Sequence, residues 1–191
     1  MLKTLAISVL WLCSVACAST VNANTSDESL WHALKTKHHV ALMRHALAPG
    51  TGDPANFDIA KRSTQRNLSD VGRAQATSIG DRFRQYGIAE AEVYSSLWFR
   101  CMETAELLDL GEVTALPALN SFFQDFSQRT TRTDALKAWL LAAALDTPRV
   151  LVTHQVNITA LTGVYPTSGE IVVLRVDPAT GVQVLGSIEP D

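Results

Sequence analysis

Four side chains in this sequence could act together on one anion. They are two arginines and two histidines: Arg44, His45, Arg100 and His154. A guanidinium group binds phosphate oxygens through paired hydrogen bonds, and a neutral imidazole is an available nucleophile near pH 7. If the anion is phosphate, one histidine would attack phosphorus while the other histidine and both arginines would hold the remaining oxygens. Because phosphoryl transfer depends mostly on positioning and charge stabilisation, these residue types predict that chemistry, provided that the fold brings them together.

Each of these residues lies at or shortly after the end of a short apolar segment. The three segments are residues 40–43, 93–95 and 150–153. Short apolar runs of this kind are typical of strands buried in the middle of an α/β sheet. The carboxyl ends of parallel strands share one edge of the sheet, where open α/β sheets bind ligands. We therefore expect the two arginines and the two histidines to meet at that edge.

The remaining pattern alternates strands with helices. Expected strands are 40–43, 93–95, 113–116, 150–153, 171–176 and 182–188. Expected helices are 29–37, one from Ser69 to about Gly87, one around Arg100, 134–145 and 157–161. Ser69 is the expected N-cap of its helix. This order predicts the α/β class, as a three-layer α/β/α sandwich with a mainly parallel sheet and a C-terminal hairpin.

Two long loops, residues 46–67 and 119–132, are expected to surround the strand ends and to select the substrate. Arg62 and Arg66 in the first loop could line the mouth of the site, although we expect each to be a solvated surface charge. The phenylalanines of the second loop could cover a substrate or pack against the core. They are Phe122, Phe123 and Phe126.

Residues 1–23 are predicted to be a secretory signal peptide, which leaves residues 24–191 as one domain. Lys3 supplies a positive start, Leu5–Ala18 is nearly all apolar, and small residues follow. The protein is therefore expected to be exported, and periplasmic if its source is Gram-negative. Two alternatives remain open, an uncleaved membrane anchor and a lipid anchor on Cys17. We expect no stable membrane span after the signal is removed.

The net charge, the cysteine count and the histidine spacing argue against several kinds of partner and cofactor. Loss of Lys3 with the signal changes the formal net charge from −3 to −4, which does not favour a nucleic-acid partner. Cys101 is then the single remaining cysteine, so no intrachain disulfide is expected, and an isolated cysteine is more often a small buried apolar group than a nucleophile. His32, His38 and His39 show no metal-ligand spacing.

Four blocks of the sequence resemble the histidine phosphatase superfamily, in the order in which that family carries them. Arg44-His45-Ala46 is similar to its Arg-His pair, and Leu68–Ala76 to its Leu-(Ser/Thr)-x-x-Gly-x-x-Gln-Ala segment. Ser95–Ala105 is similar to its Ser-Ser-Pro-x-x-Arg-x-x-x-Thr-Ala block, and Val150–His154 to its apolar strand ending in histidine. Together the blocks span residues 40–162, so the resemblance covers most of the expected domain.

The resemblance implies a phosphatase that hydrolyses a phosphomonoester through a phosphohistidine intermediate, and the predicted signal peptide makes it an exported one. It makes His45 the phosphate acceptor and assigns Arg44, Arg100 and His154 to the rest of the phosphate pocket. It also implies a small phosphorylated substrate and no metal or other cofactor. Two alternatives stay open: a non-catalytic phosphate- or anion-binding module on the same fold, and a phosphatase for phosphohistidine or another phosphoryl group.

The chain departs from the family pattern at several positions. Ala46 stands where the family usually has glycine, and Leu97 where it has proline. Many members place a glutamate in the loop after the third strand as proton donor, and this loop has none. Asp125 is the nearest acid and is the predicted general acid, with Asp53 and Glu170 as alternatives.

Overall fold

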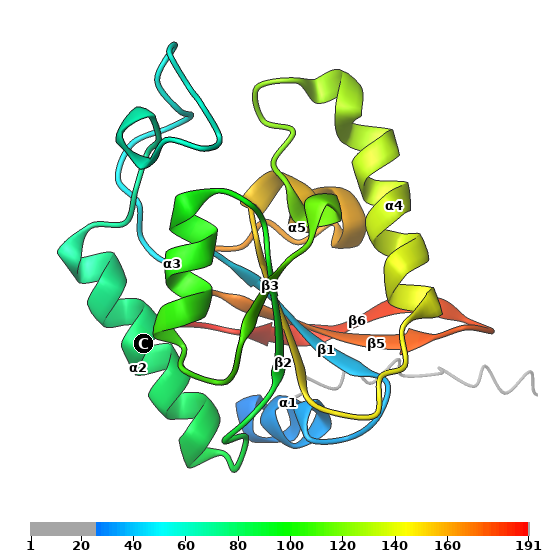
Figure 1. Cartoon of the computed structure of the whole chain (residues 1–191). Coiled ribbons are helices and arrows are strands. Elements are labelled where there is room, and N and C mark those ends of the chain that lie inside the picture. The colour runs from blue at the N-terminus through cyan, green and yellow to red at the C-terminus, as the bar shows by residue number, and fades with distance from the viewer. Residues whose placement is uncertain (1–25, 191) are drawn as a thin grey trace, which may run out of the picture.

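The structure is a computed structural model that describes residues 26–190 (Figure 1). In this part of the chain, the strands are β1 (His39–Arg44), β2 (Glu92–Ser95), β3 (Val113–Ala115), β4 (Arg149–Thr153), β5 (Ile171–Asp177) and β6 (Gly181–Ile188). The helices are α1 (Asp27–Leu34), α2 (Asp70–Gln85), α3 (Phe99–Leu107), α4 (Arg129–Ala142) and α5 (Gln155–Thr162). The predicted signal peptide, residues 1–23, and Cys17 lie outside the described residues.

All six strands form one sheet, in the order β3-β2-β4-β1-β5-β6. The first four strands along the chain pair in parallel, whereas β5 pairs antiparallel with both β1 and β6. The prediction of a mainly parallel sheet with a C-terminal hairpin is therefore confirmed. Because β1 and β4 are direct neighbours and β2 lies next to β4, the ends of these three strands meet at one edge of the sheet.

Helices cover both faces of the sheet and make the predicted three-layer sandwich (Figure 1). One core lies between the sheet and α1, α2 and α3, and includes Trp31, Phe83 and Met43. The other core lies between the sheet and α4 and α5, and includes Leu140 and Ile158. Alternate residues of the central strands supply the two cores, since successive side chains of a strand point to opposite faces.

Helix α2 begins as predicted and lies very close to the segment that follows β1. Ser69 is its N-cap, and the hydroxyl oxygen accepts a hydrogen bond from the Gly72 amide at 3.0 Å. The Ser69 amide donates to the Leu47 carbonyl. A Cβ atom on Gly72 would lie only 2.0 Å from that carbonyl oxygen. Glycine is therefore needed here to let the helix start beside the loop after His45.

Helix α4 differs most from the prediction. It begins at Arg129 instead of residue 134, so the second long loop is shorter than expected. Its first residues are Arg-Thr-Thr-Arg-Thr, which carry no apolar periodicity from which a helix could be recognised. A single 3-10 turn, Phe126–Gln128, leads directly into the helix and sets its start.

The strand β1 extends one residue further than predicted and ends at Arg44.

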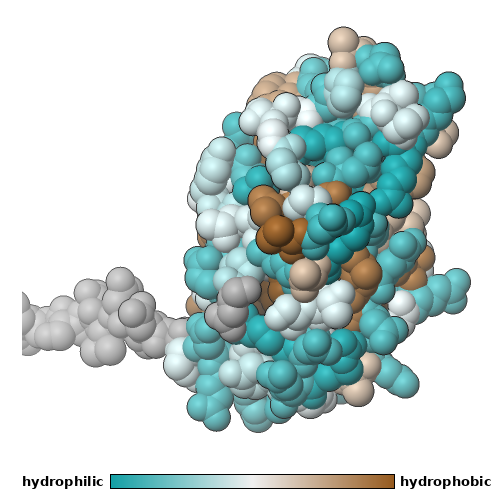
Figure 2. Space-filling view, turned by 90° about the vertical axis from the view of Figure 1, so that its left-hand side faces the viewer, coloured by the Kyte–Doolittle hydropathy of each residue, from teal (hydrophilic) through white to brown (hydrophobic). Residues whose placement is uncertain are grey.

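The surface shows no broad apolar region on the face drawn in Figure 2, where polar residues predominate and hydrophobic patches are small. Among residues 26–190, no helix is both long and apolar enough to cross a membrane.

Candidate active site

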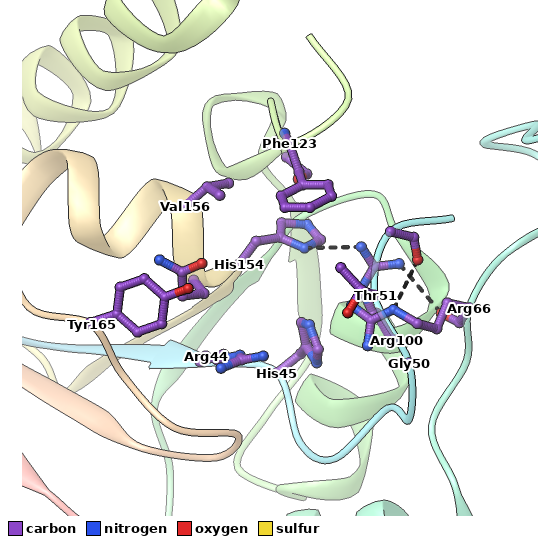
Figure 3. Close-up of a pocket in the computed structure, with 13 residues that line it drawn as sticks. Arg44, His45, Gly50, Thr51, Arg66, Arg100, Phe123, His154, Val156 and Tyr165 are labelled. Carbon is purple, nitrogen blue, oxygen red and sulfur yellow. Dashed lines mark hydrogen bonds between the residues drawn. The ribbon is translucent and has the colours of Figure 1, made fainter. Parts of the chain in front are cut away.

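The four residues predicted to form an anion site line one cavity of about 160 Å³ at the ends of β1, β2 and β4. Arg44 is the last residue of β1 and His45 follows it. Arg100 lies in the first turn of α3, just after β2, and His154 connects β4 to α5. Figure 3 shows these side chains around a common space. The prediction that the fold gathers them is confirmed, and their chemical roles stay predictions.

His45 is fixed so that one ring nitrogen is available. Its main-chain amide donates to the Thr153 carbonyl at 3.0 Å, which ties it to β4. Its Nδ1 lies 2.8 Å from the Ala46 carbonyl oxygen. Because a carbonyl can only accept, Nδ1 carries the proton and Nε2 of the neutral ring keeps its lone pair. Burial, and then the charge of Arg100, hold the His45 pKa well below its ordinary value of 6.5.

His154 is also buried and neutral, with the opposite tautomer. Arg100 donates to its Nδ1 at 3.4 Å, so Nε2 carries the proton and donates to Ser96 Oγ at 2.8 Å. Burial and the charge of Arg100 lower the His154 pKa well below 6.5. The two imidazole rings lie 5.6 Å apart, centroid to centroid. Such a protonated Nε2 is a hydrogen-bond donor that needs no positive charge on the ring.

Asp53 holds Arg100 in a buried, bidentate ion pair. The Arg100 Nη1 lies 2.8 Å from Asp53 Oδ1, and Nη2 lies 3.3 Å from Oδ2. Each side chain is 4% exposed. The same carboxylate accepts hydrogen bonds from Trp98 Nε1 at 3.0 Å and from the Arg66 amide at 3.0 Å. Burial raises the pKa of Asp53, but the hydrogen bonds from Arg100 and Arg66 outweigh it, and the pKa is lowered.

Two of the arginines present unpaired donors. The Nε atoms of Arg44 and Arg100 are buried and have no hydrogen-bond partner among the described residues. Arg44 is anchored through Nη1, which donates to the Pro166 carbonyl at 2.8 Å. Arg44 and Arg100 both line the cavity, so it is bordered by positively charged groups.

Arg66 is a site residue that the sequence reasoning missed. We expected it to be a solvated loop charge, but it lines the cavity. Its Nε donates to the Gly52 carbonyl at 3.0 Å, and its Nη1 donates to the Ala48 carbonyl. Burial, and then the charge of Arg100, lower the Arg66 pKa to about 10. The loop folds back on itself, so a residue far from any strand end reaches the cavity.

Residues of the family-like blocks hold the catalytic segments in place. The Gln75 Oε1 accepts from the Leu47 amide at 2.9 Å, and its Nε2 donates to the Ser168 carbonyl at 3.0 Å. The Thr104 hydroxyl oxygen accepts from the Ala46 amide at 3.1 Å. Gln75 and Thr104 therefore fix the main chain directly after His45 without reaching the cavity.

The two departures from the family pattern fit this structure. Ala46 is fully buried beside the site. The Leu97 amide donates to Asn120 Oδ1 at 2.9 Å, a hydrogen bond that proline could not make because it has no N–H.

The structure does not bring the predicted proton donor into the cavity. Asp125 points back to cap the 3-10 turn, and its Oδ1 accepts from the amide and the hydroxyl of Ser127. Glu170 is buried and accepts from the Thr167 amide at 2.7 Å, and it does not line the cavity either. Asp53 is held ionised by Arg100. Across residues 26–190, no aspartate or glutamate lines this cavity.

Other reactive side chains do not add to the site. Cys101 lies behind His154, with Sγ 3.5 Å from Nε2, and burial raises the pKa of its thiol to about 12. It is therefore not a thiolate at neutral pH. Residues 26–190 contain no group of three His, Cys, Asp or Glu side chains that could hold a metal ion.

Fold and site together define an α/β protein with an arginine-rich cavity beyond the carboxyl ends of its strands, where open α/β sheets bind ligands. The family model of the histidine phosphatase superfamily, branch 1, matches residues 40–150, which is more than half of the chain. The chain belongs to this superfamily.

Individual relatives are distant. The serine/threonine-protein phosphatase Pgam5, mitochondrial, of Drosophila virilis is 31% identical over 77 residues, which are 40% of this chain and 24% of that protein. The chain thus spans about a quarter of the length of that relative.

Two solved structures share the fold. The protein histidine phosphatase SixA in complex with tungstate is 18% identical, with a TM-score of 0.57 over 80% of this chain and 97% of that one. A mycobacterial glucosyl-3-phosphoglycerate phosphatase is 17% identical, with a TM-score of 0.58 over 80% and 98%.

Proposed function

We propose that the protein is an exported phosphatase that hydrolyses a small phosphomonoester through a phosphohistidine on His45. The Nε2 lone pair attacks phosphorus, the bond to the leaving oxygen breaks, and that oxygen keeps the electron pair and takes a proton from solvent water. A water molecule then attacks phosphorus and releases a proton to solvent, the P–N bond breaks with its electron pair returning to Nε2, and inorganic phosphate leaves. Arg44, Arg66 and Arg100 would balance the charge on the non-bridging oxygens, while His154 Nε2–H belongs to the hydrogen-bonded support of the cavity.

The observation that carries this proposal is the neutral, buried His45, whose free Nε2 shares a cavity with three arginines. A nucleophilic imidazole must be unprotonated, and burial among cations favours the unprotonated ring. The same cations would attract a phosphate dianion and hold it close to the ring.

A second candidate is hydrolysis of a phosphohistidine or another phosphoryl group with a good leaving group. The absence of aspartate and glutamate from the cavity lining favours it, because such a group departs with little help from a proton donor. The likeness in fold to a protein histidine phosphatase is compatible with this candidate.

The test is His45→Ala, which we expect to abolish turnover of p-nitrophenyl phosphate. Rapid quench of the wild type should trap acid-labile phosphate on the protein, and none should form on the variant. His32→Ala, at an exposed position of α1, is the matched control and should keep wild-type turnover. Turnover that survives in His45→Ala would contradict the proposal. The hydrolysis rates of phosphoramidate and an alkyl phosphate then separate the two candidates. Turnover of the alkyl phosphate favours the phosphomonoesterase, and turnover of phosphoramidate alone favours the second candidate.

Export is supported by the sequence of residues 1–23 alone. Fractionation of cells that produce the full chain should recover a shortened protein outside the cytoplasm. Cys17→Ser should leave that result unchanged if the segment is a cleaved signal, and should prevent membrane retention if Cys17 carries a lipid. Recovery of the full-length chain in the cytoplasm would contradict export.

A further inference from the structure

A second cavity adjoins the cavity beside His45, which we call the phosphate cavity. Its volume is about 230 Å³, and it shares Gln155, Val156 and Tyr165 with the phosphate cavity. Its other walls come from α5, the start of α4 and the turn before α4. We call this second cavity the side groove. Because these three residues line both spaces, the cavities are neighbours, and a molecule whose phosphate lies beside His45 would reach the side groove across this shared border.

Exposed aromatic side chains line the two cavities. Among the large hydrophobic side chains that are exposed in the described residues, the aromatic ones are Phe123, Phe126 and Tyr165, and each of them lines at least one of the two cavities. Phe126 is 60% exposed and Tyr165 is 74% exposed. Exposed aromatic rings that gather at one place mark a binding surface, whereas scattered ones need no explanation.

The rings form a continuous path from the phosphate cavity to the side groove. Phe123 lines the phosphate cavity, and its ring centroid lies 6.1 Å from that of Phe126, which lines the groove. Phe126 in turn lies 6.0 Å from Phe122, which is buried and forms the groove wall. In Figure 3, Phe123 lies above His154, and Tyr165 lies to the left of Arg44 and His45. Ring centroids roughly 4.5–7 Å apart are within the range of favourable aromatic pairs, so a further ring can pack against these side chains.

We propose that the side groove binds the leaving group of the substrate, and that this leaving group is an aromatic ring. The inference rests on the proposed phosphatase function and names the substrate class as aryl phosphates. The cavity lining points the same way, since it holds no carboxylic acid. A phenol is far more acidic than an alkyl alcohol, so its oxygen can leave without a strong proton donor.

The test fills the side groove without touching the phosphate cavity. Ala160 lines the groove but not the phosphate cavity, so Ala160→Trp should place a ring where the leaving group would lie. Expected results are a loss of tenfold or more in kcat/KM for 4-methylumbelliferyl phosphate and a change within about twofold for acetyl phosphate, which has no ring. The control Ala74→Trp, at an exposed position of α2, should change neither value.

A second variant covers the case in which Ala160→Trp does not fold. Phe126→Ala should raise KM for 4-methylumbelliferyl phosphate with little change in kcat, and should leave acetyl phosphate turnover intact. Octyl phosphate serves as an apolar substrate without a ring, and we expect the wild type to hydrolyse it poorly.

The outcomes separate the two proposals. If the wild type hydrolyses neither acetyl phosphate nor the aryl phosphate, the proposed function fails. If both are hydrolysed and the groove variants affect them equally or not at all, the groove does not hold the leaving group. If octyl phosphate is hydrolysed as well as the aryl phosphate, the groove binds apolar chains generally and the aromatic class is wrong.

Discussion

Asp53 shows how one loop residue can control the cavity without lining it. Its carboxylate binds both terminal nitrogens of Arg100 and the indole N–H of Trp98, all with little exposure to solvent. This arrangement leaves Arg100 Nε free and fixes the plane of the guanidinium group. Asp53 is therefore a positioning residue, which acts on phosphate through Arg100.

Asp53→Asn should lower both activity and stability. An amide cannot balance the buried charge of Arg100, and we expect a loss of roughly 1–3 kcal/mol in the free energy of unfolding. The KM for p-nitrophenyl phosphate should rise, because Arg100 is no longer held in one orientation. Steady-state kinetics and urea unfolding measure the two effects.

Asp58→Asn is the control for this prediction, since Asp58 lies in the same loop and its carboxylate pairs with two close neighbours in sequence, the Ala60 amide and Lys61. It should leave KM unchanged. Equal KM values for the wild type and Asp53→Asn would show that Asp53 does not position Arg100.

At the scale of elements, the start of α2 is the part of the fold that most directly constrains the site. It touches Leu47, two residues after the proposed nucleophile, through Gly72, the Ser69 amide and Gln75. This contact explains why a helix that lines no part of the cavity carries a family-like block.

Gly72→Ala should therefore reduce kcat as well as stability. The added Cβ would lie 2.0 Å from the Leu47 carbonyl oxygen, so helix and loop must separate. Overpacking of this kind costs about 1–3 kcal/mol. Gly80→Ala is a matched control in the same helix, because its Cβ would lie 2.2 Å from the Leu108 carbonyl oxygen, away from the cavity. It should cost similar stability and leave kcat intact. Equal kcat losses in both variants would contradict a specific role for the Leu47 contact.

For the whole molecule, the two buried histidines tie folding to pH. Both have pKa values well below 6.5 in the folded state, so the folded chain keeps them neutral where the unfolded chain protonates them. Unfolding then takes up protons as the pH falls through 6.5, which means that stability is lost on acidification.

Between pH 7.5 and 5.5 each of these histidines should reduce the free energy of unfolding, by roughly 1 kcal/mol. His45→Asn should remove one such contribution and flatten the pH dependence by that amount. His32→Asn, at an exposed position, should follow the wild type. Urea unfolding at the two pH values is the measurement, and a pH dependence unchanged in His45→Asn would show that the His45 pKa does not differ between the folded and unfolded states.

The sequence by itself determined the fold class and the four central site residues. Apolar runs 40–43 and 150–153 end directly in Arg44-His45 and His154, and a parallel sheet can only place such ends along one edge. The N-cap Ser69 was equally readable, because its hydrogen bond is made within four residues of chain.

Only the tertiary structure decided which loop residues reach the cavity. Arg66 lines the cavity, and Asp53 forms an ion pair with Arg100. Asp125 instead hydrogen-bonds Ser127 outside the cavity, although all three are charged residues of polar loops. The physical reason is that local periodicity carries no information about contacts between segments far apart in the chain. The Asp53–Arg100 pair spans 47 residues, and it depends on how the loop after β1 folds back over the strand ends.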